Sequence, residues 1–177
     1  MKAILFFVLL LSSHLALAAN PNIIIDTNKG KMTLELYPDK APITVANFKR
    51  YIKQDQFQGT IFHRVINNFM IQGGGFLSSG QRASTFPPIQ NESVNGLSNA
   101  RGTISMARTN DPHSATRQFF INQKDNDFLN ARGTQWGYTV FGKVTSGMEV
   151  IDAIANVPKK ADKPLQDIII NSITLVE

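Results

Sequence analysis

The chain contains no cysteine, which excludes disulfide bonds, thiolate metal sites and a cysteine nucleophile. It also excludes a lipid anchor of the bacterial lipoprotein type, because that anchor is attached to a cysteine. Stability must therefore come from an apolar core. A chain of 177 residues, 42% of them hydrophobic and 18% charged, has the composition of one ordinary globular domain.

Long runs of positive charge are absent as well. Lys and Arg total 18 against 13 Asp and Glu, a formal charge of +5, but no basic run is longer than Lys159-Lys160. No zinc-finger spacing and no basic segment interleaved with aromatic residues accompanies this charge. We therefore expect a solvated basic surface and no nucleic-acid partner.

An apolar run long enough to cross a membrane, about 20 residues, is also missing. The first segment has one positive residue, Lys2, an apolar run over 3–11, and a small-residue ending at Ala16-Leu17-Ala18. This pattern predicts a secretory signal peptide over residues 1–18. Cleavage after Ala18, or after Ala19 as the alternative, leaves residues 19–177 as a single domain.

The later segment 168–176 is apolar but too short to span a bilayer, so we expect no membrane association after cleavage. The expected location is a bacterial periplasm, with secretion to the medium as the alternative. In a eukaryotic secretory route Asn91-Glu92-Ser93 would be a glycosylation acceptor, but chance explains such a triplet better.

Most catalytic motifs are missing. Gly73-Gly74-Gly75 lacks the Lys-Ser/Thr pair of a phosphate-binding loop, which favours a tight turn or bulge. Beyond the leader, only His63 and His113 remain, without metal-ligand spacing. No serine lies in a G-x-S-x-G motif. We expect neither a metal nor a cofactor, and a core or hydrogen-bonded role for His63.

Short strands dominate the predicted structure. Alternating or β-branched runs predict strands, and apolar residues at helical spacing predict two helices. The expected strands are 22–27, 31–37, 59–66, 69–72, 103–107, 118–122, 137–144 and 167–176.

The first predicted helix contains Val45, Phe48, Tyr51 and Ile52, with Thr44 as N-cap. The second follows a capping box over 146–149 and contains Val150, Ile151 and Ile154. The segment 73–99 is rich in Gly, Ser, Asn and Pro and is expected to be irregular. Many short strands with two helices indicate a closed or sandwiched β architecture capped by helices.

Two polar residues are unusual in this pattern. Arg64 and Gln72 lie within strongly apolar strands, and alternation places Arg64 on the same face as Phe62. A charge buried there would require a partner or a function.

The segment 62–74, Phe-His-Arg-Val-Ile-Asn-Asn-Phe-Met-Ile-Gln-Gly-Gly, resembles the F-H-R-V-x-x-x-F-M-I-Q-G-G signature of the cyclophilins, the peptidyl-prolyl cis-trans isomerases. Later blocks at 102–107, 118–121, 128–130 and 140–144 resemble the family in the same order, so the resemblance covers about Ile23 to Val176. It implies a mainly β fold, a closed eight-stranded antiparallel β-barrel capped by two α-helices.

The resemblance also implies a site for proline-containing polypeptides. The family's catalytic arginine falls on Arg64, and its substrate-contacting glutamines fall on Gln72 and Gln118. The backbone that pairs with bound peptide falls on 107–109, that is Ala107, Arg108 and Thr109, where the family commonly has Ala-Asn-Ala. The proline pocket falls on Phe69, Met70, Phe120 and Leu129.

Two departures resemble bacterial members. Phe128 stands where eukaryotic cyclophilins carry the tryptophan that binds cyclosporin, and Tyr138 stands where they carry a pocket histidine. We therefore expect weak cyclosporin binding, with the catalytic arginine retained. Trp136 is expected to be a packing or loop residue.

The predicted function is isomerisation of Xaa-Pro bonds by a monomer that assists the folding of exported proteins. Two alternatives use the same groove: a proline-segment binding module or holdase without turnover, and a secreted effector acting on one partner. Retention of Arg64 argues against the binding module.

Overall fold

The computed structural model describes residues 19–176, which form an eight-stranded antiparallel sheet, a two-stranded hairpin (β8 Lys159–Lys160 and β9 Lys163–Pro164) and two α-helices. The sheet order is β10-β1-β2-β7-β5-β6-β4-β3. The strands are β1 Asn22–Thr27, β2 Gly30–Leu36, β3 Thr60–Ile66, β4 Met70–Leu77, β5 Thr103–Met106, β6 Phe119–Asn122, β7 Val140–Ser146 and β10 Ile170–Val176. The expected signal peptide lies outside the described residues.

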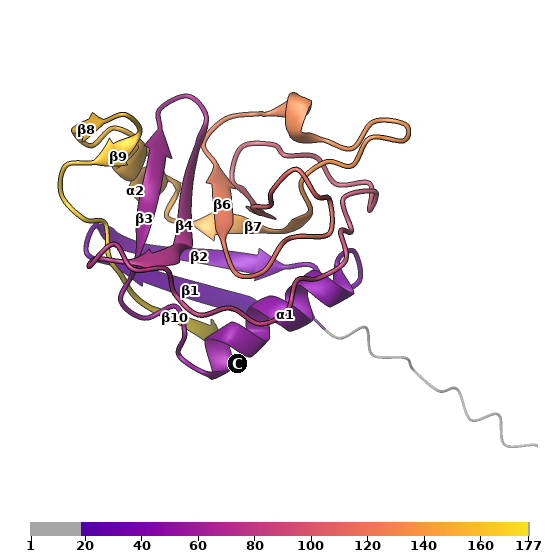
Figure 1. The fold of residues 1–177 in the computed structure, drawn as a ribbon, viewed down its shortest axis with the longest axis horizontal. Coiled ribbons are helices and arrows are strands. Elements are labelled where there is room, and N and C mark those ends of the chain that lie inside the picture. Colours follow the sequence, from indigo (N-terminus) through magenta and orange to yellow (C-terminus); the bar gives the residue numbers. More distant parts are fainter. Residues whose placement is uncertain (1–18, 177) are drawn as a thin grey trace, which may run out of the picture.

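The sheet curls around its own core. Strands β1, β2 and β10 run in a different direction from β3, β4 and β6, which stand over them (Figure 1). At the seam between the outer strands, Ile61 and Ile169 form an isolated bridge, and the Phe62 amide donates to the Ile168 carbonyl. The predicted mainly β fold is confirmed, but "closed" overstates it, because the seam is bridged rather than continuously paired.

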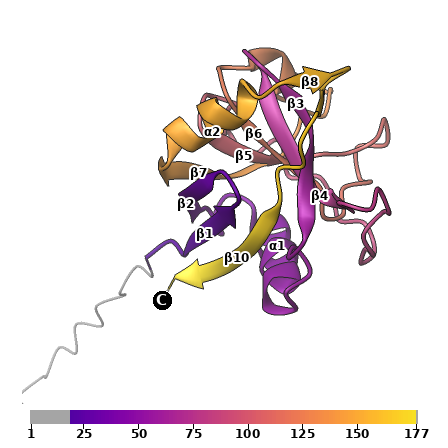
Figure 2. The same cartoon turned by 90° about the vertical axis from the view of Figure 1, so that its left-hand side faces the viewer.

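The two helices lie at opposite ends of this sheet (Figures 1 and 2). Helix α1 (Pro42–Lys53) lies beside β10, and α2 (Met148–Ala155) lies beside β2, β3 and β4. The buried side of α1 includes the four predicted residues Val45, Phe48, Tyr51 and Ile52. Both helices therefore cover the sheet with one apolar stripe, as the periodicity predicts.

Aromatic rings fill the core beneath α1. The Phe48 ring lies 4.8 Å from Phe57, 5.5 Å from Phe119 and 5.1 Å from Phe141, measured between centroids. These rings are tilted or edge-on, the arrangements that aromatic pairs prefer. The core therefore joins α1 to β6 and β7 through contacts between aromatic rings.

Both predicted helix caps are wrong. Helix α1 begins after Ala41, and the amides of Ile43 and Thr44 donate to the two carboxylate oxygens of Glu92, at 3.0 and 2.8 Å. A carboxylate at this end satisfies amides that lack partners within the helix. Helix α2 begins after Gly147, whose left-handed φ of 92° ends β7, and no side chain caps it.

Strand β4 extends to Leu77, so the irregular segment begins later than predicted. A Cβ on Gly73 would lie 2.8 Å from the Phe62 ring, and one on Gly75 would lie 2.6 Å from the Gln118 amide nitrogen. The pairing register with β3 also shifts between Thr60 and Phe62, which confirms the bulge expected here. These glycines allow close packing inside the sheet.

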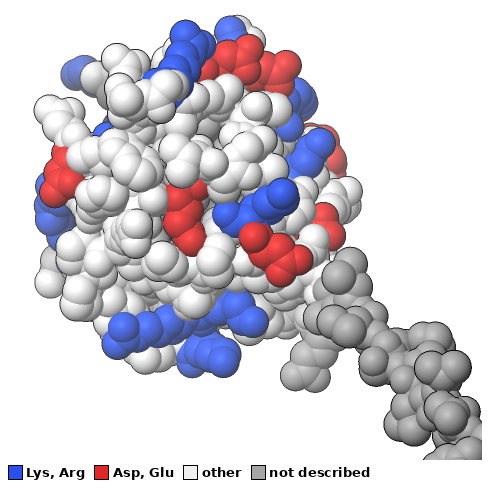
Figure 3. Space-filling model, turned by 90° about the vertical axis from the view of Figure 1, so that its right-hand side faces the viewer, with Lys and Arg blue, Asp and Glu red and all other residues white. Residues whose placement is uncertain are grey.

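The surface mixes both signs of charge. Basic side chains gather at the lower edge of Figure 3, the height at which α1 runs, and its last turns carry Lys49, Arg50 and Lys53. Elsewhere on this face acidic side chains lie among the basic ones. Within residues 19–176, no helix is long and apolar enough to cross a membrane. Asn91, in the possible glycosylation triplet, is buried and donates to the Pro112 and Gly137 carbonyls.

Candidate active site

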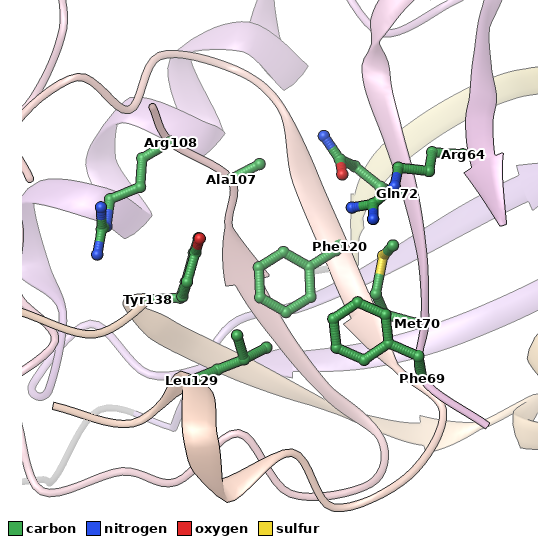
Figure 4. Close-up of a pocket in the computed structure, with 9 residues that line it drawn as sticks. All are labelled: Arg64, Phe69, Met70, Gln72, Ala107, Arg108, Phe120, Leu129 and Tyr138. Atoms are coloured by element: carbon green, nitrogen blue, oxygen red, sulfur yellow. The ribbon is translucent and has the colours of Figure 1, made fainter. Parts of the chain in front are cut away.

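A pocket of about 320 Å³ opens beside β3, β4 and β6 and is closed by the loops after β5 and after the 3-10 helix η1 (Asp127–Leu129). It brings together residues from six separate segments of the chain (Figure 4). Its lining residues are Arg64, Phe69, Met70, Gln72, Ala107, Arg108, Phe120, Leu129 and Tyr138. All nine were predicted as site residues from the sequence.

Arg64 reaches the pocket because of a bulge in β3. Phe62 pairs with Gly73 and Arg64 pairs with Gln72, so β3 has one more residue than β4 over this stretch. Phe62 and Val65 are both buried in the core, whereas 46% of the Arg64 side chain is exposed. The prediction that Phe62 and Arg64 share a face is wrong, because a bulge breaks the alternation. Arg64 is consequently a half-exposed charge at the pocket and not a buried one.

The apolar wall of the pocket is a small cluster separate from the main core. Met70, Phe120 and Leu129 are 2%, 4% and 9% exposed, and Phe69 and Tyr138 pack against them. The Tyr138 ring meets Phe120 edge-on at 5.6 Å. Such a packed wall has little freedom to collapse, so it presents a preformed apolar surface to a ligand ring.

The two predicted glutamines form a pair. The Gln72 side-chain nitrogen donates to the Gln118 side-chain oxygen at 3.0 Å. Gln118 does not line the first pocket but an adjoining hollow of about 290 Å³, which shares Gln72, Ala107 and Arg108 with it. The two hollows therefore adjoin, and together they are called the groove below: the first has the apolar wall and the second is lined mainly by polar side chains.

Arg108 holds two loops of the groove together. Its guanidinium donates to the carbonyls of Gly137, Thr109 and Trp136 at 2.9–3.1 Å, and it lies 4.6 Å above the Tyr138 ring. The side chain points away from the pocket centre (Figure 4). This arrangement leaves the backbone of 107–109 along the groove and places Trp136 in a loop, as predicted.

Phe128 is the one predicted residue that lines neither hollow. Its side chain is 66% exposed and stacks on Phe69, with centroids 5.6 Å apart and planes at 24°. It extends the apolar wall outward at the rim, where a longer ligand could contact it.

A chain of asparagines lies beneath the pocket. Asn126 donates to the Phe69 carbonyl and to the Asn122 side chain, Asn122 donates to Asn99, and Asn99 donates to the Tyr138 carbonyl, all at 2.8–3.3 Å. These three asparagines are buried. These hydrogen bonds connect the Phe69 and Tyr138 backbones through buried side chains, so this chain ties the two walls to each other, although Oδ1 of Asn126 has no partner.

Sequence reasoning missed two charged residues at the groove. Arg82 lines the adjoining hollow, and the Asp162 carboxylate lies 3.6 Å from Nε of Arg64. Both come from segments far from Arg64 in sequence and carry no motif. Only the pairing of strands brings them to the site.

His63, next to Arg64, lies behind the site. Its Nδ1 is buried without a hydrogen-bond partner, and its ring meets Phe76 edge-on at 4.7 Å. Burial lowers the pKa of His63 from its ordinary value because it disfavours the imidazolium form, and the charges of Arg64 and Arg82 act in the same direction. The unfolded chain therefore binds a proton here more readily than the folded protein.

This difference predicts a loss of stability in mild acid. Because the pKa is lower in the folded state, the contribution is present above the unfolded value of about 6.5 and is lost as pH falls below it. Urea unfolding at about pH 7.5 and pH 5.5 should show a drop in the free energy of unfolding that is smaller in His63→Gln. Equal drops in both proteins would contradict this role of His63.

Comparison with known proteins agrees with this geometry. A family model described as cyclophilin type peptidyl-prolyl cis-trans isomerase/CLD matches residues 22–175. A peptidyl-prolyl cis-trans isomerase of Acinetobacter baylyi is 57% identical over 150 residues, which cover 85% of this chain and 79% of the relative. Peptidyl-prolyl cis-trans isomerase B of Escherichia coli is 51% identical over 159 residues, covering 85% of this chain and 97% of the relative.

Solved structures show the same likeness. The crystal structure of a cyclophilin type peptidyl-prolyl cis-trans isomerase from Cryptosporidium parvum matches with a TM-score of 0.76 at 29% identity. The match covers 89% of this chain and 98% of the other. Both the sequence and the fold are therefore similar over nearly all the described residues.

Proposed function

Because the chain belongs to the cyclophilin-type peptidyl-prolyl cis-trans isomerases and is such an isomerase, we propose that Arg64 is its catalytic residue and that the apolar pocket holds the proline ring. One observation carries this assignment. The Arg64 guanidinium extends from β3 toward the centre of the pocket, beside the wall that contains Met70 and Phe120 (Figure 4).

The chemistry requires no bond to break. Rotation about Xaa-Pro faces a barrier of about 18–20 kcal/mol because the amide loses its resonance. Twisting makes the proline nitrogen pyramidal and gives it a lone pair, so a donor aimed at that nitrogen stabilises the twisted state more than the planar one. A guanidinium stays protonated and offers a rigid fork of donors, which suits Arg64 to this task better than a lysine.

The pocket has a separate task. Phe69, Met70, Phe120 and Leu129 hold the proline ring while the preceding carbonyl swings. Gln72, which lines both hollows, and Gln118, which lines the second, contact the peptide backbone, and the 107–109 backbone pairs with it. Because the proline end of the bond is held, movement of the preceding carbonyl converts the bond between its cis and trans forms. No step in this scheme uses a cofactor.

The chain is proposed to act on exported, proline-containing polypeptides in the periplasm, with secretion to the medium as the alternative. The signal-peptide pattern over residues 1–18 supports this location. Periplasmic extracts of a bacterial host expressing the full chain should contain a protein that begins at residue 19 or 20. A protein that retains Met1 and stays with the cytoplasm would contradict the proposal.

The proposed assistance to folding is tested by refolding of a substrate protein whose slow phase is proline-limited. Catalytic amounts of the mature chain should accelerate that phase. Slowing of refolding, or protection only at stoichiometric amounts, would favour a holdase that grips proline segments without turnover. We further propose a monomer that binds cyclosporin weakly, because Phe128 offers a smaller ring than tryptophan at the rim.

A further inference from the structure

The geometry points to Asp162 as a positioning residue that orients the Arg64 guanidinium, an inference that rests on the proposed catalytic role of Arg64. The Asp162 carboxylate oxygen Oδ2 lies 3.6 Å from Nε of Arg64. The two side chains are 47% and 46% exposed. Asp162 comes from the turn of a hairpin formed by β8 (Lys159–Lys160) and β9 (Lys163–Pro164).

This hairpin is attached directly to β3. The Val65 amide, one residue after Arg64, donates to the Asp162 carbonyl at 2.7 Å. At the hairpin's base, Nζ of Lys159 donates to the Ala155 carbonyl at the end of α2, at 2.8 Å. The Asp162 backbone is therefore held against the strand that carries Arg64. A substitution of the Asp162 side chain consequently changes the ion pair and leaves this backbone hydrogen bond in place.

The turn itself is strained. Ala161 and Asp162 both have left-handed backbones, with φ of 47° and 65°. Tight hairpin turns of this kind strongly prefer Asn-Gly or Asp-Gly, and an alanine in this conformation costs free energy. Strain of this sort persists where the surrounding structure requires a particular geometry. Asp162 is the only carboxylate in this turn. It lies beside Arg64, although two other basic residues, Lys160 and Lys163, are much closer to it in sequence.

Stability does not explain the pair. Two half-exposed partners contribute only about 0–1 kcal/mol to folding. Asp162 meets the guanidinium at Nε, on the side nearer the strand, while the rest of the group extends toward the pocket (Figure 4). A long side chain with several free torsions is thereby biased toward one orientation, in which its terminal nitrogens point toward the pocket. Such preorganisation acts on the rate of the chemical step.

The test is Asp162→Asn, which removes the charge, keeps the shape and tolerates the same left-handed backbone. We expect kcat/KM for a short Xaa-Pro peptide to fall about fivefold, equivalent to about 1 kcal/mol. The loss should appear in kcat and leave KM nearly unchanged. Asp162→Glu should restore part of it, and the NMR signal of Arg64 Nε should shift and broaden in Asp162→Asn only.

Asp55 provides the matched control. It is an exposed aspartate with a left-handed backbone, φ 50°, and it lines neither hollow of the site. Asp55→Asn should leave both kinetics and the Arg64 signal unchanged. If Asp162→Asn fails to fold, Asp162→Gly removes the same carboxylate at a position that favours glycine.

The outcomes separate the two proposals. An inactive wild type, or full activity in Arg64→Ala, would overturn the proposed role of Arg64 itself. Dependence on Arg64 together with unchanged kcat and an unchanged Arg64 Nε signal in Asp162→Asn would overturn only the role of Asp162. A rise in KM with constant kcat would also overturn it, because Asp162 would then act on binding.

Discussion

Arg64→Ala should lower kcat/KM for an Xaa-Pro peptide about a thousandfold and leave the fold intact. The guanidinium is the donor aimed at the pocket, and losing about 4 kcal/mol of stabilisation of the twisted state corresponds to three factors of ten in rate. Folding should survive because the side chain is half exposed and belongs to no buried cluster. The measurement is peptide isomerisation by the wild type and the variant at equal concentration.

Circular dichroism and urea unfolding of the same variant serve as the controls for folding. Arg64→Lys retains the positive charge but lacks the planar fork, so it should recover only a small part of the lost rate. A folded Arg64→Ala protein within tenfold of the wild type would show that Arg64 serves another purpose, such as binding alone.

Gly137→Ala should destabilise the protein by about 3 kcal/mol, the upper part of the usual range for overpacking. A Cβ at this position would lie 2.6 Å from the Leu129 carbonyl oxygen and 2.6 Å from the Asn130 carbonyl carbon. These are backbone atoms and cannot move aside as a flexible side chain does. The Tyr138 amide donates to that same Leu129 carbonyl at 2.9 Å. Separating the two segments would therefore also widen the apolar pocket and raise KM.

Gly133→Ala is the comparison for this prediction. Gly133 belongs to the same loop and has a left-handed φ of 55°, and a Cβ added to it would meet no atom within 4 Å. Its substitution should cost only the backbone strain, about 1 kcal/mol. Urea unfolding of both variants tests the difference. Equal losses would mean that the close packing at Gly137 carries no special cost.

The regular part of the fold was predictable from local patterns. The β1–β2 hairpin, the buried stripe of α1 and most strands follow from periodicity, because each buries one face against a single core. The β3 bulge was not predictable, since it depends on the glycines of β4 and on the partner's register. The cap of α1 was missed for a similar reason: Glu92 lies 48 residues away from Thr44.

The candidate site was likewise predictable only in part. Its pocket residues came from a resemblance that a distinctive motif supports, and strand pairing brings them together as expected. Asp162 and the buried asparagines 99, 122 and 126 were missed, because their partners are set by tertiary contacts rather than by spacing in the sequence. Composition alone identifies none of them as part of a site.

The central claim is tested most directly by NMR exchange on a short Xaa-Pro peptide mixed with a small amount of the mature chain. The peptide alone interconverts over tens to hundreds of seconds, too slowly for exchange signals between its cis and trans forms. With the wild type, such signals should appear, and with Arg64→Ala they should vanish while the peptide still binds. Binding of the peptide by the wild type without exchange would contradict the account and identify a proline-binding module.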